Sequence, residues 1–323
     1  MVAFILRRLG QAILVMLAVG LIAFALFRFV GDPVIFMLGQ DATPEDRIRV
    51  TQQLGLDQPF YVQYARFVER AVHGEFGLSL RQVRPVSMLI VERLPATLEL
   101  SFMAALFALA AGIPMGVYTA LRRNSWFSHF LLGVSLVGVS LPTFLIGILL
   151  ILVFAVQLGV LPSFGRGDTV MVGWWSTGFL TASGLKALIL PSITLGLFQM
   201  TLVQRLVRSE MLEVLRTDYI RFARARGLTD RAVHFGHALK NTLVPVMTIT
   251  GLQLGAIIAF SIITEQVFQW PGMGLLFIQA INFADVPVMA AYLCLIGLFF
   301  VIINLAVDLL YYAVDPRLRL QTT

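Results

Sequence analysis

Six apolar stretches without a charged side chain constrain this chain more than any other feature of its sequence. They cover residues 9–27, 101–121, 130–156, 187–204, 243–263 and 287–307. The hydrocarbon core of a bilayer is about 30 Å thick, and an α-helix of about 20 apolar residues spans it. Because backbone groups in lipid must be hydrogen-bonded within the segment, each stretch is expected to be helical. The sequence therefore predicts an all-α integral membrane protein with six transmembrane helices.

The composition agrees with a membrane protein and gives no support to nucleic-acid binding. Only 13% of the residues are charged, whereas soluble domains contain about 25%. The formal net charge is +6, but the basic residues flank the apolar stretches, as in the positive-inside rule. The first stretch is longer than the apolar region of a signal peptide, about 7–15 residues, so we expect a retained helix. The expected partner is the lipid bilayer, and no nucleic acid.

Basic residues in the short connections predict that both termini are cytoplasmic. Arg7 and Arg8 precede the first stretch, Arg122 and Arg123 lie in a short connection, and the segment 205–240 contains eight arginines and lysines. Short connections rich in such residues stay on the cytoplasmic side.

This topology divides the chain into four parts. They are the cytoplasmic N-terminus with the first helix, residues 1–30; an extracytoplasmic helical segment, 31–94; a five-helix transmembrane core, 95–312; and a cytoplasmic tail, 313–323.

The extracytoplasmic segment carries the pattern of two short helices. Thr43 and Pro44 suit the start of the first helix and Gly55 its end, while Asp57 and Gly74 suit the start and end of the second. One face of the second helix is expected to hold Tyr61, Tyr64, Ala65, Val68 and Val72. The helices form either a structural lid over the outer ends of the spans or a surface that contacts substrate.

Four prolines fall in the apolar stretches. We expect Pro114 to break the second span, Pro142 and Pro191 to interrupt the third and fourth, and Pro245 to begin the fifth. Pro114 and Pro142 are candidates for hinges or for positions along a transport path. The four tryptophans are expected at membrane interfaces, as in aromatic belts: Trp126, Trp174, Trp175 and Trp270.

Three acidic residues lie near the ends of spans, where a charge is tolerated but costly. Glu99 either faces a transport path or pairs with Arg93, and Asp308 suits pairing with an arginine at the level of the lipid head groups. Glu265, at the outer end of the fifth span, is a candidate for a gate or for contact with an extracytoplasmic protein.

The segment between the fourth and fifth stretches is predicted to form two helices joined by a corner at a glycine. We expect the fourth span to continue as an amphipathic helix to Gly227, a residue suited to the left-handed position past a helix end. Thr229 and Asp230 then suit the start of a second helix. Such a corner fits insertion into a groove on another protein, although a basic amphipathic stretch can also lie flat on anionic lipid.

The sequence "DYIRFARARGLTDRAVHFGHALKNTLVPV" resembles the cytoplasmic loop of ABC importer permeases of the dipeptide and oligopeptide family. The usual Glu-Ala-Ala before the glycine is replaced by Arg221-Phe222-Ala223, as in the peptide-permease branch. Further matches in the same order are "GEFGLSLRQVRPV", "ERLPATLEL", "TEQVFQWPGMGLL" and "VDPRLR".

The resemblance implies a type I ABC importer permease fold and a role in binding-protein-dependent peptide transport by alternating access. It also implies a second homologous permease subunit, two cytoplasmic ATPase subunits that hold ATP and Mg²⁺, an extracytoplasmic substrate-binding protein and a short peptide substrate. The coupling segment would be residues 208–242. Its contact with the ATPase would consist of Arg221, Phe222, Ala223, Arg224, Ala225, Arg226, Gly227, Leu228, Thr229 and Asp230. The resemblance leaves the substrate open among dipeptides, oligopeptides, glutathione, opines and nickel complexes.

We expect no enzyme active site, cofactor or metal on this chain. A P-loop requires Gly-Lys-Ser/Thr, and the only two lysines are Lys186 and Lys240, which follow leucines. A proton-coupled secondary transporter is the alternative, but the central parts of the six stretches lack the ionisable relay that such transporters use. A membrane enzyme is disfavoured because ionisable residues do not cluster.

Overall fold

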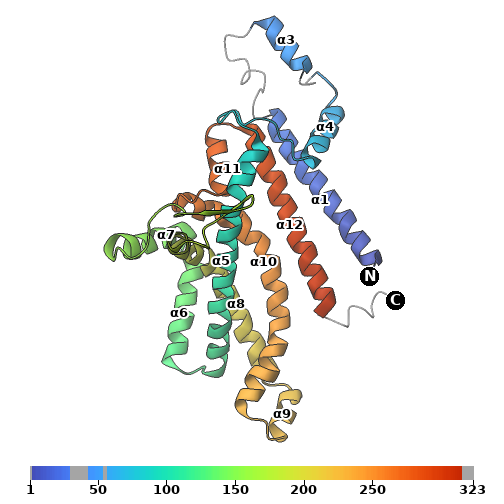
Figure 1. Ribbon diagram of the computed structural model, residues 1–323. Coiled ribbons are helices and arrows are strands. Elements are labelled where there is room, and N and C mark those ends of the chain that lie inside the picture. Colours follow the sequence, from blue (N-terminus) through green and yellow to red (C-terminus); the bar gives the residue numbers. More distant parts are fainter. Residues whose placement is uncertain (1, 30–42, 54–56, 315–323) are drawn as a thin grey trace. The chain divides into compact units, whose positions relative to one another are not determined.

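The computed structural model describes residues 2–29, 43–53 and 57–314, which are almost entirely helical (Figure 1). The helices are α1 (Val2–Phe29), α3 (Pro44–Gln53), α4 (Phe60–Val72), α5 (Val86–Leu121), α6 (Trp126–Ser140), α7 (Thr143–Leu150), α8 (Ala182–Val214), α9 (Asp218–Ala225), α10 (Leu239–Val267), α11 (Met273–Asn282) and α12 (Val286–Val314). Two π-helical segments, η1 (Ile151–Gln157) and η2 (Ala232–Ala238), and two short strands, β1 (Val170–Val172) and β2 (Trp175–Thr177), complete the fold.

The described residues contain four to six candidate membrane spans. Four helices are long and apolar enough to cross a bilayer, and the number rises to six if each of two bent pairs counts as one span. The chain forms two compact units, Met1–Pro95 with Pro271–Ile302 (unit 1) and Ala96–Trp270 with Ile303–Thr323 (unit 2).

In unit 1, α4 packs along α1 through a face that shares Tyr64 with the predicted one but otherwise differs from it. Tyr64 donates a hydrogen bond to the carbonyl of Leu17 at 2.7 Å, and Phe60 and Phe67 contact the ring of Phe24. Residues 60, 64 and 67 share one helical stripe, and these aromatic contacts leave Tyr61 72% exposed.

The start of α4 also corrects a prediction. The helix begins at Phe60 after Pro59, rather than at a cap formed by Asp57, because the residue before a proline is driven out of the helical conformation. The predicted start of α3 at Pro44 is confirmed, whereas its predicted end at Gly55 lies outside the described residues.

In unit 1, hydrogen bonds also hold the turn before α5, which contains Ser79, Leu80 and Arg81. The buried carboxylate of Asp285 accepts hydrogen bonds from the hydroxyl of Ser79 and from the backbone N–H groups of Leu80 and Arg81. The guanidinium of Arg81 lies 3.8 Å from the ring centroid of Phe283. One carboxylate therefore joins the turn to the segment between α11 and α12.

Unit 2 is built around α8, which packs against α6, α7 and α10. Glycines on α5 allow a close approach to α8: a Cβ on Gly116 would lie 2.6 Å from Cβ of Val207, and one on Gly112 would lie 2.8 Å from the carbonyl of Met200. Such small residues let helix backbones pack closely in membranes.

The prolines behave differently from one another. α5 runs unbroken through Pro114 and α8 runs through Pro191, so the predicted interruptions at these two positions are wrong. α10 begins at Leu239 and contains Pro245 in its interior, so Pro245 does not begin this helix as predicted. A helix survives a proline where neighbouring helices offset the lost hydrogen bond. Only Pro142 separates two helices, α6 and α7, which meet at a bend of 116°. Leu141 takes extended angles, φ −93° and ψ 140°, because the following proline disfavours helical ones.

A small antiparallel hairpin, absent from the sequence-based expectation, lies between η1 and α8. Strand β1 pairs with β2 in the register Val170 to Thr177 and Val172 to Trp175. Gly173 opens the two-residue loop with a φ of +64°, which suits a hairpin turn that starts with glycine.

Candidate functional site

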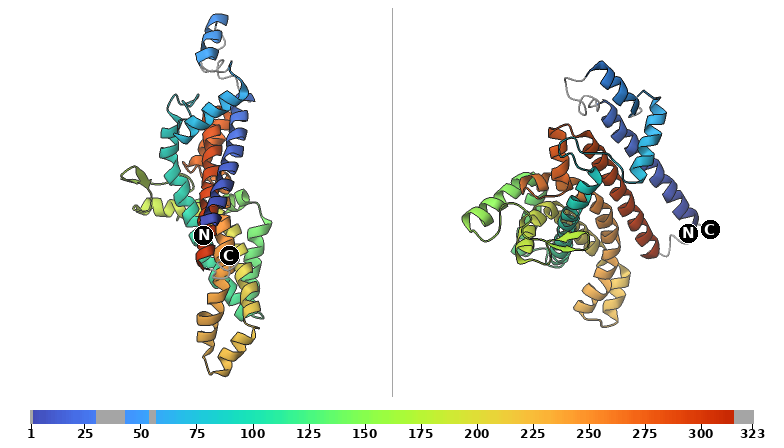
Figure 2. Two further views of the ribbon diagram at one scale, coloured as in Figure 1. Left: turned by 90° about the vertical axis from the view of Figure 1, so that its right-hand side faces the viewer. Right: turned by 45° about the horizontal axis from the view of Figure 1, so that its top comes forward.

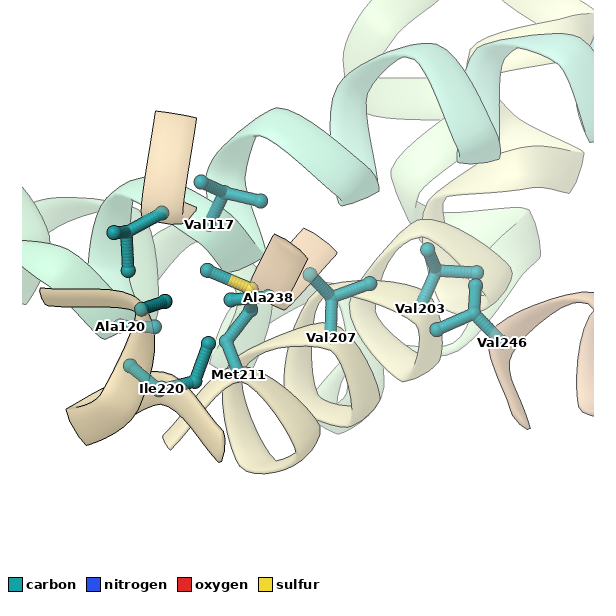
Figure 3. Close-up of a cluster of buried hydrophobic side chains, with 10 residues drawn as sticks. Val117, Ala120, Val203, Val207, Met211, Ile220, Ala238 and Val246 are labelled. Atoms are coloured by element: carbon teal, nitrogen blue, oxygen red, sulfur yellow. The ribbon is translucent and has the colours of Figure 1, made fainter. Parts of the chain in front are cut away.

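The short helix α9 lies at the end of unit 2 that also contains the turn between α5 and α6 (Figures 1 and 2). Its inner side enters a hydrophobic cluster, in which Ile220 is 0% and Ala223 5% exposed (Figure 3). The other members come from α5, α8, η2 and α10: Val117, Ala120, Val203, Val207, Met211, Val233, Ala238 and Val246. This close packing places α9 in direct contact with the core of the helices that share the cluster.

The corner after α9 has the hydrogen bonds of a Schellman motif. The N–H of Leu228 donates to the carbonyl of Ala223 at 3.3 Å, and the N–H of Gly227 donates to that of Arg224 at 2.9 Å. Gly227 has a φ of +78°, so the predicted left-handed glycine is confirmed. This pattern satisfies carbonyl groups at the helix end and fixes the direction of the departing chain.

The outer side of α9 is basic and partly aromatic. Phe222 is 64% exposed, and the guanidinium of Arg226 lies 5.7 Å from its ring centroid. Two exposed ion pairs order the surface: Arg221 with Asp218 at 3.1 Å and Arg224 with Asp230 at 4.0 Å. Of the ten residues predicted from the sequence for this contact, only Ala223 is buried.

The helix before the corner differs from the prediction. The fourth span does not continue unbroken to Gly227, because α8 ends at Val214 and α9 begins at Asp218. Thr217 separates them in an extended conformation, φ −68° and ψ 152°, and its hydroxyl donates to the carbonyl of Val214 at 2.7 Å. A threonine that bonds to the local backbone competes with helix continuation.

A tyrosine–histidine contact joins the two sides of the corner. The hydroxyl of Tyr219 and Nδ1 of His237 form a hydrogen bond of 2.7 Å, and the rings meet edge to face. The predicted cap at Thr229 is confirmed by the bond from the N–H of Ala232 to its hydroxyl at 3.4 Å. The tyrosine–histidine contact was not predicted, because the two side chains are 18 residues apart in the sequence.

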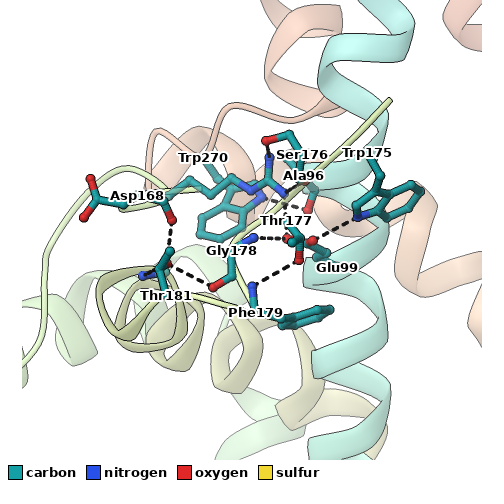
Figure 4. A network of polar contacts seen from close by, with 12 residues as sticks. Ala96, Glu99, Asp168, Trp175, Ser176, Thr177, Gly178, Phe179, Thr181 and Trp270 are labelled. Atoms are coloured by element: carbon teal, nitrogen blue, oxygen red, sulfur yellow. Dashed lines mark hydrogen bonds and ion pairs between the residues drawn. The ribbon is translucent and has the colours of Figure 1, made fainter. Parts of the chain in front are cut away.

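At the other end of unit 2, Glu99 is the centre of a buried polar network (Figure 4). Its carboxylate accepts hydrogen bonds from Nη2 of Arg166 at 2.6 Å, Nε1 of Trp175 at 3.1 Å and the N–H of Gly178 at 3.2 Å. Glu99 is 2% and Arg166 8% exposed. The predicted pairing with Arg93 is therefore wrong, because the segment that carries the hairpin brings Arg166 to this carboxylate.

Further bonds hold the same segment in place. The hydroxyl of Thr181 donates to the carbonyl of Asp168 at 2.6 Å, and that of Ser183 donates to the Asp168 carboxylate at 2.7 Å. The N–H of Gly165 donates to the carbonyl of Phe268 at 2.9 Å. The segment between η1 and α8 is thus fastened to α5, to α8 and to the residue that follows α10.

Glu265, predicted to act as a gate or to contact an extracytoplasmic protein, is fully buried. Its carboxylate accepts hydrogen bonds from the hydroxyl groups of Thr97 at 2.7 Å and Ser261 at 3.2 Å. Trp270, expected at a membrane interface, is also fully buried, and its Nε1 donates to the carbonyl of Ala96 at 2.9 Å. In this conformation neither side chain is accessible to a soluble protein.

Among the described residues, no group of three or more His, Cys, Asp or Glu side chains has the arrangement needed to hold a metal ion. The side chain of Asp308 lies outside the described set. The geometry of unit 2 therefore offers a projecting basic corner and a buried ion pair rather than a reactive cluster.

Comparisons with protein families match both parts of the chain. Residues 112–320 match a family described as the binding-protein-dependent transport system inner membrane component, and residues 1–101 match the N-terminal part of such components.

Individual relatives match over the full length. A dipeptide transport system permease protein of Escherichia coli K12 is 40% identical over 99% of each chain. A di/tripeptide transport system permease protein of Pseudomonas aeruginosa is 42% identical over 99% of this chain and 100% of its own. A dipeptide transport system permease protein of Alkalihalophilus pseudofirmus is 38% identical with the same coverage.

A solved structure shows a similar fold. A chain of the MetNI methionine ABC transporter in an inward facing conformation matches with a TM-score of 0.56 and 20% identity, over 70% of this chain and 96% of its own. This similarity supports the predicted ABC importer permease fold.

Proposed function

The chain belongs to the family of inner membrane components of binding-protein-dependent peptide transport systems, and on that premise we propose that it moves short peptides through an ATP-driven importer. It is a bacterial inner membrane permease subunit and not an enzyme. The proposed complex contains a second homologous permease, two cytoplasmic ATPase subunits with ATP and Mg²⁺, and an extracytoplasmic binding protein that delivers the peptide.

The α9 corner, residues 218–230, is the proposed contact with an ATPase subunit. The observation that carries this assignment is the pairing of a buried anchor, Ile220, with an outward aromatic side chain, Phe222, on the same two-turn helix. A helix that presents such a face suits a groove on a partner protein. Since Ile220 packs in the cluster shared by α5, α8 and α10, a moving ATPase can shift these helices through α9.

Alternating access follows from this connection. Packed helices change between discrete arrangements rather than deforming continuously. A movement of the α9 corner therefore favours a rigid displacement of the bundle, which opens the peptide path to one side of the membrane at a time. The energy comes from ATP on the partner subunits.

Substitutions of Gly227 test this proposal. A Cβ at this position meets no atom of this chain within 4 Å, and φ is +78°, so a β-branched side chain strains the backbone at a cost of about 1–2 kcal/mol. We expect Gly227→Val to lower ATP-dependent peptide uptake strongly in proteoliposomes with the partner subunits, while membrane insertion is unchanged. Gly227→Asn is the matched control, because asparagine tolerates the left-handed region. Normal uptake by Gly227→Val contradicts the assignment.

Cross-linking tests the contact directly. The only cysteine of the chain, Cys294, is buried, so a Phe222→Cys variant with Cys294→Ala carries one exposed thiol. We expect it to cross-link to an ATPase subunit, whereas Tyr61→Cys on α4, a position at least as exposed, does not. Cross-linking from neither position, in an assembled and active complex, contradicts the proposal.

The energy source separates this function from proton-coupled transport. We expect uptake in proteoliposomes that contain ATP and an ionophore to continue without a proton gradient. Uptake driven by a gradient in the absence of ATP favours the secondary transporter instead.

A further inference from the structure

A cluster of four aromatic side chains lies at the turn between α5 and α6, outside the proposed coupling contact. Phe127 and Phe130 stack with ring centroids 6.1 Å apart. Tyr118 meets Phe127 edge to face at 5.3 Å, and Trp126 contacts both phenylalanines. All four are exposed, Trp126 by 77%. The rings thus pack on one another and present a continuous aromatic surface.

Two adjacent arginines occupy the turn itself. Arg122 and Arg123 are exposed, and within the described ranges neither guanidinium has a hydrogen bond or ion pair to a protein group. Asp168 is the only acidic residue between Glu99 and Glu210 in the sequence. The segments that form and flank the turn therefore supply no carboxylate to neutralise these charges.

The backbone of the turn is fixed although the arginine side chains are not. The N–H of Arg122 donates to the carbonyl of Tyr118 at 2.9 Å, and the N–H of Ser125 donates to the carbonyl of Arg122 at 3.1 Å. The hydroxyl of the buried Ser128 donates to the same carbonyl, and Tyr118 and Ser125 share a hydrogen bond at 3.3 Å. The turn therefore presents both guanidinium groups from a rigid base beside the rings.

The location of this surface matches the boundary of a bilayer. α5 is a candidate membrane span and α6 belongs to a bent candidate span, so their connecting turn lies where the hydrocarbon ends. Tryptophan and tyrosine concentrate at that level in membrane proteins. Arginine binds phosphate with two parallel N–H···O bonds.

We propose that Arg122 and Arg123, with the aromatic surface of Trp126, Phe127 and Phe130, bind the head group of an anionic phospholipid. The charge selects the lipid class, because a zwitterionic head group brings its own cation to the phosphate. The rings lie beside the upper acyl chains, and the arginines hold the phosphate. This site does not depend on the proposed transport function, since its residues and geometry are separate from those of the α9 corner.

Lipid binding to the intact complex tests the site. The purified permease with its partner subunits is titrated with phosphatidylglycerol or phosphatidylcholine of identical acyl chains, and bound lipid is counted by native mass spectrometry. We expect a preference for phosphatidylglycerol of roughly 30-fold, the size that two basic residues near a membrane surface provide.

Matched variants assign the preference to this turn. Arg122→Gln with Arg123→Gln is expected to abolish it, and Trp126→Leu is expected to reduce retention of the lipid. Arg66→Gln with Arg70→Gln on α4 makes the same change of charge at two exposed residues and is expected to leave the preference intact. These substitutions remove no buried contact, so folding is preserved.

Three results overturn the proposal. One is equal retention of the two lipids by the unaltered protein, and another is equal loss of the preference in both double variants. The third concerns a photoreactive side chain at position 126: a cross-link to another subunit, with none to lipid, identifies the surface as a protein interface.

Discussion

Substitution of Glu99 by glutamine isolates the energetic role of the buried ion pair. The carboxylate is surrounded by three donors, from Arg166, Trp175 and Gly178. Glutamine offers one acceptor oxygen and turns an amide N–H₂ toward the remaining donors. It also leaves the guanidinium of Arg166, a residue 8% exposed, without a counter-charge. Removal of one partner of a buried pair costs about 3–5 kcal/mol.

The assay is thermal unfolding of the detergent-purified permease at a fixed scan rate. A domain of about 150–250 residues loses roughly 2–4 °C per kcal/mol, so Glu99→Gln is expected to lower the midpoint by about 6–20 °C. Addition of Arg166→Met removes the stranded charge and is expected to recover part of the loss, because coupled residues show interaction energies of about 0.5–3 kcal/mol.

An exposed ion pair provides the control for the same chemical change. Arg84 and Glu92 form a salt bridge whose side chains are 41% and 48% exposed, and its hydrogen bond from Arg84 to Glu92 raises the pKa of Arg84. Solvent screens such pairs, so Glu92→Gln is expected to leave the midpoint unchanged. An unchanged midpoint for Glu99→Gln, or a double variant less stable than Glu99→Gln alone, refutes the reasoning.

Two further substitutions test backbone packing and backbone conformation, with the same unfolding assay. Gly116→Ala places a Cβ 2.6 Å from that of Val207 and is expected to cost about 1–3 kcal/mol by overpacking. Gly133→Ala is the control, because its Cβ meets nothing within 4 Å, and it is expected to leave the stability unchanged. Equal effects of the two substitutions argue against close α5–α8 packing. Val83 has a φ of +52° and is 76% exposed, so Val83→Gly relieves about 1–2 kcal/mol of strain at an entropic cost of about 0.5–1 kcal/mol. We expect a midpoint equal to or slightly above that of the unaltered protein, and a clear decrease contradicts the assigned strain.

The α9 corner shows how much of the site could be predicted. The position of Gly227 past a helix end follows from local backbone chemistry, and so does the capping bond at Thr229. The anchor Ile220 and the contact between Tyr219 and His237 did not emerge from the sequence, because they depend on side chains from other helices.

The prolines also show that local sequence alone does not predict where a helix breaks. Pro114 and Pro142 each lack a backbone N–H, yet α5 continues through the first while the second separates α6 from α7. The close approach of α8 beside Gly112 and Gly116 is one tertiary contact that offsets the lost backbone bond in α5. Local propensity cannot include such a contact, because the partner is about 90 residues away in the sequence.

The sequence by itself determined the class of the protein, since long uncharged apolar stretches are stable only as helices in lipid, and the order of its motifs identified the family. Only the tertiary structure decided the partners of the costly buried groups. Glu99 pairs with Arg166, 67 residues away, and Glu265 accepts from Thr97, 168 residues away. The physical reason is that a buried charge is stabilised by whichever donor the fold brings within about 3 Å, and separation in the sequence does not specify that donor.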